Sequence, residues 1–169
     1  MHAETAARSE DLSQRWNVLA TDPEAPDYYE LNEFGDVILR PRPTNLHQLR
    51  VQSVADELNR QLGPRAVSKV SVLTDRGIRV PDVSWMPAER WKSTGAATPL
   101  PFVPDVCVEV LSPGNTPEEI AMKIGAYLRG GAREVIVVSV SGEVSFHGPE
   151  GRRNLSALGI VLNLGEEPV

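Results

Sequence analysis

The pattern of apolar and polar positions is clearest between residues 104 and 140, where two apolar runs flank an amphipathic segment. The first run, PDVCVEVLS, and the second, EVIVVSV, have the β-branched character of buried strands. The segment between them has helical spacing, starts with a capping box at Thr116 and Glu119, and stops at Gly130 and Gly131. Strand, helix and strand in this order predict a βαβ unit with a parallel strand pair.

Apolar positions earlier in the chain predict a short helix, a hairpin, a long helix and two strands. The short helix ends near Ala20 and has Ser9 as a candidate cap. The other elements are expected at Tyr28–Leu39 (hairpin, with its turn near 32–36), from Pro43 and Thr44 to Gly63 and Pro64 (helix), and at Ala66–Leu73 and Gly77–Met86 (strands).

The remaining segments complete the predicted fold. A proline-rich loop, TPLPFVP, precedes the βαβ unit, and Ser141-Gly142 predicts a tight turn into a strand at EVSFHG. The tail NLSALGIVLNL is expected to add an edge strand or a short helix. The fold class is therefore α/β, a mixed sheet with helices on it, as an N-terminal helical arm (1–27) and a single domain (28–169).

Composition narrows the class of protein. The 169 residues suffice for one domain, and the hydrophobic fraction of 41% is ordinary for a globular protein. No apolar run approaches the roughly 20 residues that a membrane span needs, and the first residues lack the pattern of a signal peptide. A single cysteine, Cys107, excludes an internal disulfide and fits a cytoplasmic protein, and three histidines argue against structural zinc.

The net charge of -6 argues against a protein that simply coats nucleic acid, but the charges are unevenly distributed. Nine acidic residues face two basic ones in residues 1–36, whereas six basic residues face two acidic ones in residues 40–69. The basic segment is compatible with a surface that faces phosphates. Ordinary solvated faces explain the same pattern at least as well.

Two acidic residues stand in strands that otherwise look buried. Because side chains alternate along a strand, Glu109 shares a face with Asp105 and Cys107, and Asp82 shares one with Ile78. A buried carboxylate is unfavourable unless it is paired or binds a metal, so two of them on adjacent strands predict one site for a hard cation. The ordinary alternative is that both acids lie at strand ends and face water.

Three further residues are candidates, each with an ordinary alternative. Lys123 on the predicted helix could reach over the sheet toward Glu109, or form a solvated pair with Glu119 one turn earlier. His47 is read first as a partly buried, hydrogen-bonded histidine, and second as a proton shuttle or phosphate contact. Glu30 either faces the site from the hairpin or is a surface acid.

Four stretches of the chain follow one another in the order typical of one family: YYELNEFGDVILRP, NLHQLRVQSVADELNRQLG, GIRVPDVSWMPAERW and PDVCVEVLSPGNTPEEIAMKIGAYLRGGAREVIVVS. From about Tyr28 to Ser139 the chain resembles the Uma-two family of restriction-endonuclease-like proteins, members of the PD-(D/E)XK nuclease superfamily. The resemblance implies a restriction-endonuclease-like core and a metal-dependent nuclease.

The resemblance also implies roles for individual residues. Asp82 would be the metal-binding aspartate of the superfamily and Glu109 its second acid. The usual lysine position, two residues after that acid, holds Leu111 in this chain, and in the Uma-like pattern a lysine of the next helix, here Lys123, takes its place. Asp105 and His47 fall at positions characteristic of the family, without an assigned role, and the NEFGD variant of the hairpin leaves the role of Glu30 open.

The first functional hypothesis is a Mg²⁺- or Mn²⁺-dependent phosphodiesterase that acts on DNA. Asp82, Glu109 and the carbonyl of Val110 would hold the metal, and Lys123 would position the attacking water or stabilise the charge that develops. The rival hypothesis is a catalytically inactive nuclease scaffold that binds nucleic acid or protein. A weaker third hypothesis is a dimeric partner protein with a docking N-terminal arm. A homodimer would suit cleavage of both DNA strands, and the sequence itself shows none.

Overall fold

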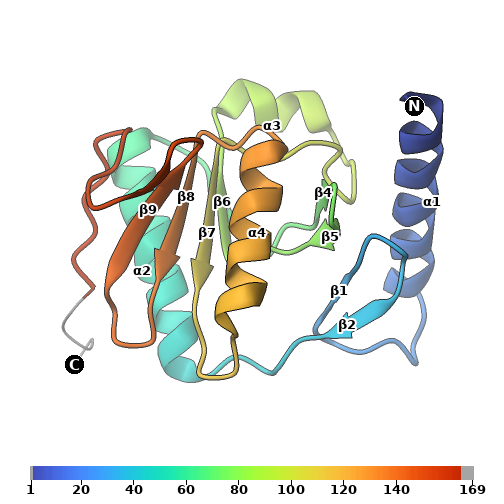
Figure 1. Cartoon of the computed structure of the whole chain (residues 1–169), viewed down its shortest axis with the longest axis horizontal. Coiled ribbons are helices and arrows are strands. Elements are labelled where there is room, and N and C mark those ends of the chain that lie inside the picture. The colour runs from blue at the N-terminus through green and yellow to red at the C-terminus, as the bar shows by residue number, and fades with distance from the viewer. Residues whose placement is uncertain (1, 165–169) are drawn as a thin grey trace.

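The computed structural model describes residues 2–164 and contains two β-sheets with helices around them (Figure 1). One sheet has four strands in the order β2-β1-β5-β4, and the other has six in the order β10-β9-β8-β7-β6-β3. The helices are α1 (His2–Ala20), α2 (Asn45–Leu62), α3 (Ala88–Thr94) and α4 (Pro117–Arg129). The strands are β1 (Tyr29–Leu31), β2 (Val37–Leu39), β3 (Ala66–Ser68), β4 (Val72–Thr74), β5 (Gly77–Arg79), β6 (Val83–Trp85), β7 (Val106–Val110), β8 (Glu134–Val138), β9 (Val144–Gly148) and β10 (Gly151–Arg153).

The predicted βαβ unit is confirmed, because β7 and β8 pair in parallel and α4 connects them. The Thr116 side chain caps α4 by accepting a hydrogen bond from the N–H of Glu119. The mixed α/β fold class is confirmed as well. The predicted hairpin is also present as β1 and β2, and the predicted long helix corresponds to α2.

The six-stranded sheet has a different apolar cluster on each face, one against α2 and one against α4 (Figure 1). Val108 belongs to the cluster that contains α2, whereas Cys107 belongs to the cluster that contains Tyr127 of α4. Alternation along β7 therefore turns Glu109 toward α4, the face that Cys107 shares. Cys107 itself is a buried core residue.

The two strands expected at Ala66–Leu73 and Gly77–Met86 are wrong as continuous elements, because each one changes sheet in the middle. In the six-stranded sheet β3, from the first half of 66–73, pairs with β6, from the second half of 77–86. In the four-stranded sheet β4, from the second half of 66–73, pairs with β5, from the first half of 77–86. Lys69 adopts a left-handed backbone with φ of 55°, and Pro81 lacks an N–H, so neither continues a ladder. Asp82 therefore lies where the chain passes from one sheet to the other.

Three other predictions need correction. The N-terminal helix begins well before Ser9, which lies inside α1 instead of capping it. The helix α3 was not predicted, because its seven residues are too few for a clear periodic pattern. The tail forms neither an edge strand nor a helix; β10 is the edge strand, and residues Ile160 and Leu162 of the irregular tail fill the core beside α2.

Helix α1 packs against the four-stranded sheet of its own chain. Leu12 shares a small buried cluster with Leu31 of β1 and Ile78 of β5, and the rings of Trp16 and Tyr29 lie 5.0 Å apart between centroids. Within residues 2–164, none of the helices combines the length and the apolar character of a membrane span.

Replacing Gly77 with alanine should destabilise the contact between β5 and β1. A Cβ at this position would lie 2.1 Å from the carbonyl oxygen of Leu31, and the backbone φ is +94°. Gly131 is a matched control, because its φ is +109° but a Cβ there meets nothing within 4 Å. We expect Gly77→Ala to lower the free energy of unfolding in urea by ~1–3 kcal/mol more than Gly131→Ala, the cost of overpacking. Equal effects of the two substitutions would contradict the described packing.

Candidate active site

Asp82 and Glu109 lie opposite each other at the junction of the two sheets. The antiparallel register pairs Val83 with Val108, so one further step brings Asp82 opposite Glu109. The N–H of Asp82 donates to the carbonyl of Val108 over 2.9 Å, and its Oδ2 accepts from the N–H of Val110 over 2.8 Å. Contacts on both sides of Glu109 thus fix the Asp82 carboxylate beside it, and the two residues lie on adjacent strands as expected.

Lys123 is fully enclosed, with an exposed fraction of 0%. Its Nζ donates to Oε1 of Glu30 over 2.9 Å and lies 3.5 Å from Oε1 of Glu109. The alternative of a solvated pair between Lys123 and Glu119 is wrong, because Glu119 pairs with Arg40 at 2.9 Å. The structure therefore brings Lys123 to the same place as Glu109.

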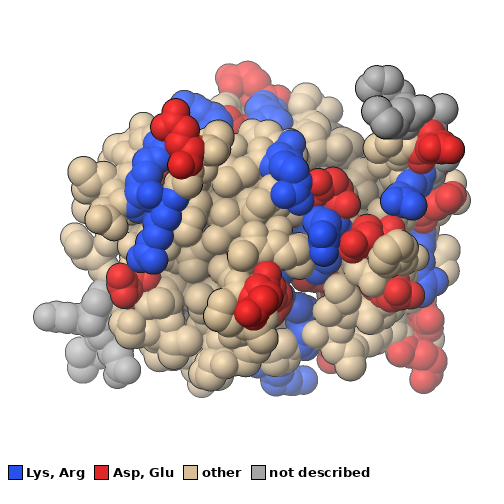
Figure 2. All heavy atoms as spheres, in the orientation of Figure 1, with Lys and Arg blue, Asp and Glu red and all other residues tan. Residues whose placement is uncertain are grey.

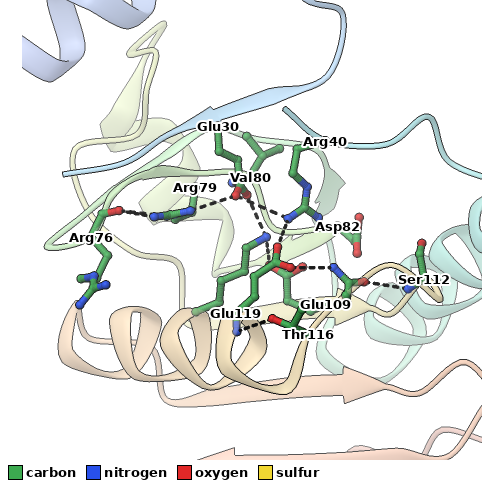
Figure 3. A network of polar contacts seen from close by, with 12 residues as sticks. Glu30, Arg40, Arg76, Arg79, Val80, Asp82, Glu109, Ser112, Thr116 and Glu119 are labelled. Atoms are coloured by element: carbon green, nitrogen blue, oxygen red, sulfur yellow. Dashed lines mark hydrogen bonds and ion pairs between the residues drawn. The ribbon is translucent and has the colours of Figure 1, made fainter. Parts of the chain in front are cut away.

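Glu30 is also fully buried, so the alternative of a surface acid is wrong. Its Oε2 lies 3.3 Å from Arg79 and 3.5 Å from Arg40, and its Oε1 also accepts from the N–H of Val80 over 2.8 Å (Figure 3). Burial by itself would raise the pKa of Glu30, but the charges of Lys123 and Arg40 outweigh burial and hold that pKa below its usual value. Glu30 is therefore the ionised partner of the buried cations.

Glu109 has a different electrostatic environment. Burial raises the pKa of its carboxyl, and the nearby Asp82 and Glu30 carboxylates add to the shift. The pKa reaches about 7 despite the opposing charges of Lys123 and Arg40. The hydroxyl of Tyr127 donates to Oε1 of Glu109 over 2.7 Å. Ionisation of Glu109 is thus less favourable than that of Glu30, although Lys123 lies beside both carboxylates.

His47 lies in the first turn of α2 and contacts Asp82 from the other side. Its Nε2 is 3.4 Å from Oδ2 of Asp82, and the exposed fraction of the residue is 8%. The hydrogen bond to Asp82 raises the pKa of His47, although burial opposes the shift. His47 is thus a buried, hydrogen-bonded histidine, the first of its two expected roles.

A pocket of about 320 Å³ opens over Asp82. Asp82 and His47 line it together with the cationic side chains Arg40 and Lys69. Glu109 and Lys123 are not among its lining residues, so they lie behind Asp82 as seen from solvent. Any small molecule or chain that enters this pocket meets Asp82 first.

The donor atoms are compatible with a hard divalent cation. The side-chain contacts of Asp82 fall on Oδ2 and those of Glu109 on Oε1, which leaves one oxygen of each carboxylate without a hydrogen bond in the part of the chain that the structure describes. Within residues 2–164, no group of three or more His, Cys, Asp or Glu side chains converges on a metal position. Two carboxylates suit Mg²⁺, which keeps several waters and shares its other ligands with substrate phosphates.

Other predicted residues lie outside this cluster or touch it only through the backbone. Asp105 precedes β7 and pairs with Arg90, away from Asp82. Val110 contributes its N–H to Asp82, and the role expected for its carbonyl stays a prediction. Leu111, at the usual lysine position of the superfamily, directly follows β7 and is half-buried.

The structure adds residues that sequence reasoning had not placed at the site. Tyr127 lies four residues after Lys123, so helical spacing alone could have paired the two. Arg79 and Arg40 contact Glu30 from β5 and from the segment after β2. No local pattern signals these contacts, because they depend on how the four-stranded sheet meets the six-stranded one.

The raised pKa of Glu109 should appear in the pH dependence of stability. The folded state keeps the proton up to about pH 7, whereas the unfolded state releases it near the ordinary value of 4.5. The free energy of unfolding therefore falls as pH rises through this window, by ~1–3 kcal/mol at most. Glu109→Gln lacks this titration. In urea unfolding, the free energy of unfolding of the variant should therefore rise relative to that of the wild type between pH 5 and pH 8.

The comparison of Glu109→Gln with the wild type uses only the pH dependence, so any constant loss of stability in the variant cancels. Parallel curves for the two proteins between pH 5 and pH 8 would contradict the assignment of the raised pKa to Glu109.

Comparison with known proteins identifies relatives of this chain. The model of the Uma2 family, described as "Putative restriction endonuclease", matches residues 14–160. A search of curated proteins finds no match. Among solved structures, "a putative nuclease belonging to DUF820" from Anabaena variabilis ATCC 29413 superposes with a TM-score of 0.65 at 20% sequence identity, covering 82% of each chain.

The superposition shows a shared fold, that of a protein described as a nuclease, and at this identity it shows the fold alone. The family match spans both acids of the junction and the lysine behind them, as well as the hairpin and α2. The chain therefore belongs to the Uma2 family of restriction-endonuclease-like proteins.

Proposed function

We propose that this protein is a divalent-metal-dependent nuclease that hydrolyses phosphodiester bonds, with DNA as the expected substrate. The observation that carries the proposal is the opposed pair of Asp82 and Glu109, of which Asp82 lines a pocket while Glu109 and Lys123 lie behind it. Membership of the Uma2 family and the nuclease description of the superposed protein support it.

Asp82 and Glu109 are the residues that would hold Mg²⁺ or Mn²⁺, with the carbonyl of Val110 as the expected third oxygen. The bound ion would polarise the scissile phosphate and lower the pKa of an attacking water. His47 and the N–H of Val110 both hold Oδ2 of Asp82, so the orientation of that carboxylate is set before any ligand arrives.

The cations of the site have separate roles in this proposal. Arg40 lines the pocket and is 20% exposed, so it can reach a phosphate there. Lys123 is fully enclosed and acts as a positioning residue through Glu109, because its charge favours the ionised carboxylate that a metal requires. Glu30 keeps Lys123 in place.

A non-catalytic binding module is the second candidate, and two observations favour it. Leu111 stands where the superfamily usually carries its lysine, and Lys123 has no exposed surface from which to reach a substrate. Such a module would bind metal or nucleic acid without turnover. Incubation with supercoiled and single-stranded circular DNA in Mg²⁺ and in Mn²⁺ separates the two candidates.

Calorimetric titration of Mn²⁺ should detect the metal site without a substrate. We expect the wild type to bind Mn²⁺ and Asp82→Asn to bind it at least ~10-fold more weakly, because the variant loses a charged oxygen ligand. Asp105→Asn is the matched control and should bind like the wild type, since Asp105 pairs with Arg90 outside the cluster. Equal affinity of the wild type and Asp82→Asn would contradict the proposed ligand.

Substitutions at Lys123 should separate a role in cleavage from a role in folding. Lys123→Met leaves two buried carboxylates without their shared cation, so it should lower the free energy of unfolding by ~3–5 kcal/mol. Removing the charge of Glu30 as well, in Glu30→Gln/Lys123→Met, should recover part of that stability but not cleavage, which should stay at least ~100-fold below the wild type.

Glu30→Gln alone is the matched control, because it keeps the charge of Lys123 beside Glu109. Plasmid cleavage and urea unfolding are measured on all of these variants. Full cleavage by a folded double variant would show that Lys123 serves stability only.

A further inference from the structure

The pocket over Asp82 is unusually rich in aromatic side chains. The whole chain has three Trp, three Tyr and three Phe, and three of these nine line this pocket: Trp16, Tyr28 and Tyr29. Trp16 comes from α1, and the two tyrosines come from the start of the hairpin, so residues far from the acids in sequence form the wall. All three side chains are only half-buried, which leaves ring surface available to a ligand.

The acids lie too deep for a rigid duplex to reach them. Asp82 is 4% exposed and lines a pocket of about 320 Å³, and Glu109, behind it, is 1% exposed. A duplex is stiff over many base pairs and keeps its bases stacked inside. A single strand can bend and insert one nucleotide, with its base against an aromatic ring and its phosphate toward the acids.

Charge around the pocket favours a short contact with the phosphate backbone. Lys69 is exposed, forms no ion pair within residues 2–164, and places its Nζ 5.6 Å from the centroid of the Tyr28 ring. Its left-handed backbone, with φ of 55°, is of the kind that often occurs at functional sites. Asp27 and Asp82 also line the pocket and offset the charges of Arg40 and Lys69, so the rings must supply part of the affinity.

Two other basic residues of the segment 40–69 are engaged within the protein. Within the basic segment, Arg50 is buried and donates to the carbonyl of Val140, and Arg60 pairs with Glu57. On the face drawn in Figure 2, acidic side chains lie close to most groups of basic ones. Stable binding of a duplex needs several phosphate contacts along one surface.

We propose that the pocket formed by Trp16, Tyr28 and Lys69 over Asp82 binds an unpaired nucleotide, and that single-stranded nucleic acid is the substrate class of this site. The proposal rests on the proposed function, because the phosphate of that nucleotide would be the one presented to Asp82 and Glu109. The base stacks on the rings of Trp16 and Tyr28, and Lys69 contacts an adjoining phosphate. The stacking is tolerant of sequence, since every base has a π-face.

Binding of labelled oligonucleotides tests the proposal without cleavage. Fluorescence anisotropy of (dT)12, (rU)12 and a 12-base-pair DNA duplex is measured with the full-length wild type in EDTA at low salt. We expect at least one single strand to bind ~10-fold tighter than the duplex, and the two strands to report the preference for DNA or RNA. The logarithm of the binding constant should fall with the logarithm of salt concentration with a slope of about -1.4 for two phosphate contacts, and Lys69→Met should reduce the slope by about 0.7.

Variants of the aromatic wall test the stacking directly. Tyr28→Leu and Trp16→Ala should each weaken single-strand binding by about 5- to 150-fold, the range of one base–aromatic stack, and Trp16→Phe should restore most of it. Phe34→Ala is the matched control and should bind like the wild type, because Phe34 is 76% exposed and outside this pocket. If Trp16→Ala weakens the packing of α1, Tyr28→Leu still tests the stacking, because Tyr28 lies outside α1.

Equal or tighter binding of the duplex overturns the proposal, as does binding of no probe or single-strand binding that Tyr28→Leu leaves unchanged in a folded protein. None of these outcomes contradicts the proposed metal-dependent nuclease, which is tested separately by Mn²⁺ binding to the wild type and Asp82→Asn and by DNA cleavage. Absence of Mn²⁺ binding together with tight single-strand binding would support the nucleotide pocket and contradict the metal-dependent nuclease.

Discussion

The enclosed charge of Lys123 is the constraint on which the rest of the structure depends. A lysine without exposed surface is stable only if carboxylates neutralise it, and here the two carboxylates come from different sheets. Glu30 belongs to β1 of the four-stranded sheet and Glu109 to β7 of the six-stranded sheet, so one ammonium group from α4 fixes the two sheets against each other. Arg79 holds the second oxygen of Glu30 and completes the junction.

The charges at this junction bear directly on the proposed metal site. Glu30 is enclosed and lies within 3.5 Å of Lys123, Arg79 and Arg40, and the charges of Lys123 and Arg40 lower its pKa. Glu109 shares Lys123 with Glu30 and lies beside Asp82, so burial and like charge raise its pKa. A divalent ion would be the largest local charge and would reverse that shift, because it favours both carboxylates in their ionised form. The same interactions that fold the junction thus favour the ionised form of Glu30 and disfavour that of Glu109.

Local sequence predicted the parts of the site that lie within one element. The alternation in β7 and the helical spacing in α4 placed Glu109 and Lys123 on faces that can meet, since the crossover connects them directly. Local sequence did not predict the places where strands change sheet. The apolar runs around Lys69 and Pro81 look continuous, because a strand has the same alternation whichever sheet it joins, and only pairing partners decide where it crosses.

The sequence by itself determined the βαβ unit, the long capped helix, the hairpin and two anomalous acids, because these follow from periodicity, capping and the unfavourable burial of charge. Tertiary structure alone decided that Glu30 and Lys123 are enclosed instead of solvated, and that α1 adds an aromatic wall over Asp82. Both outcomes depend on contacts between residues far apart in the chain, such as the 93 positions between Glu30 and Lys123. The physical reason is that burial is a property of the assembled sheets, and no local pattern encodes which charged side chain the second sheet will cover.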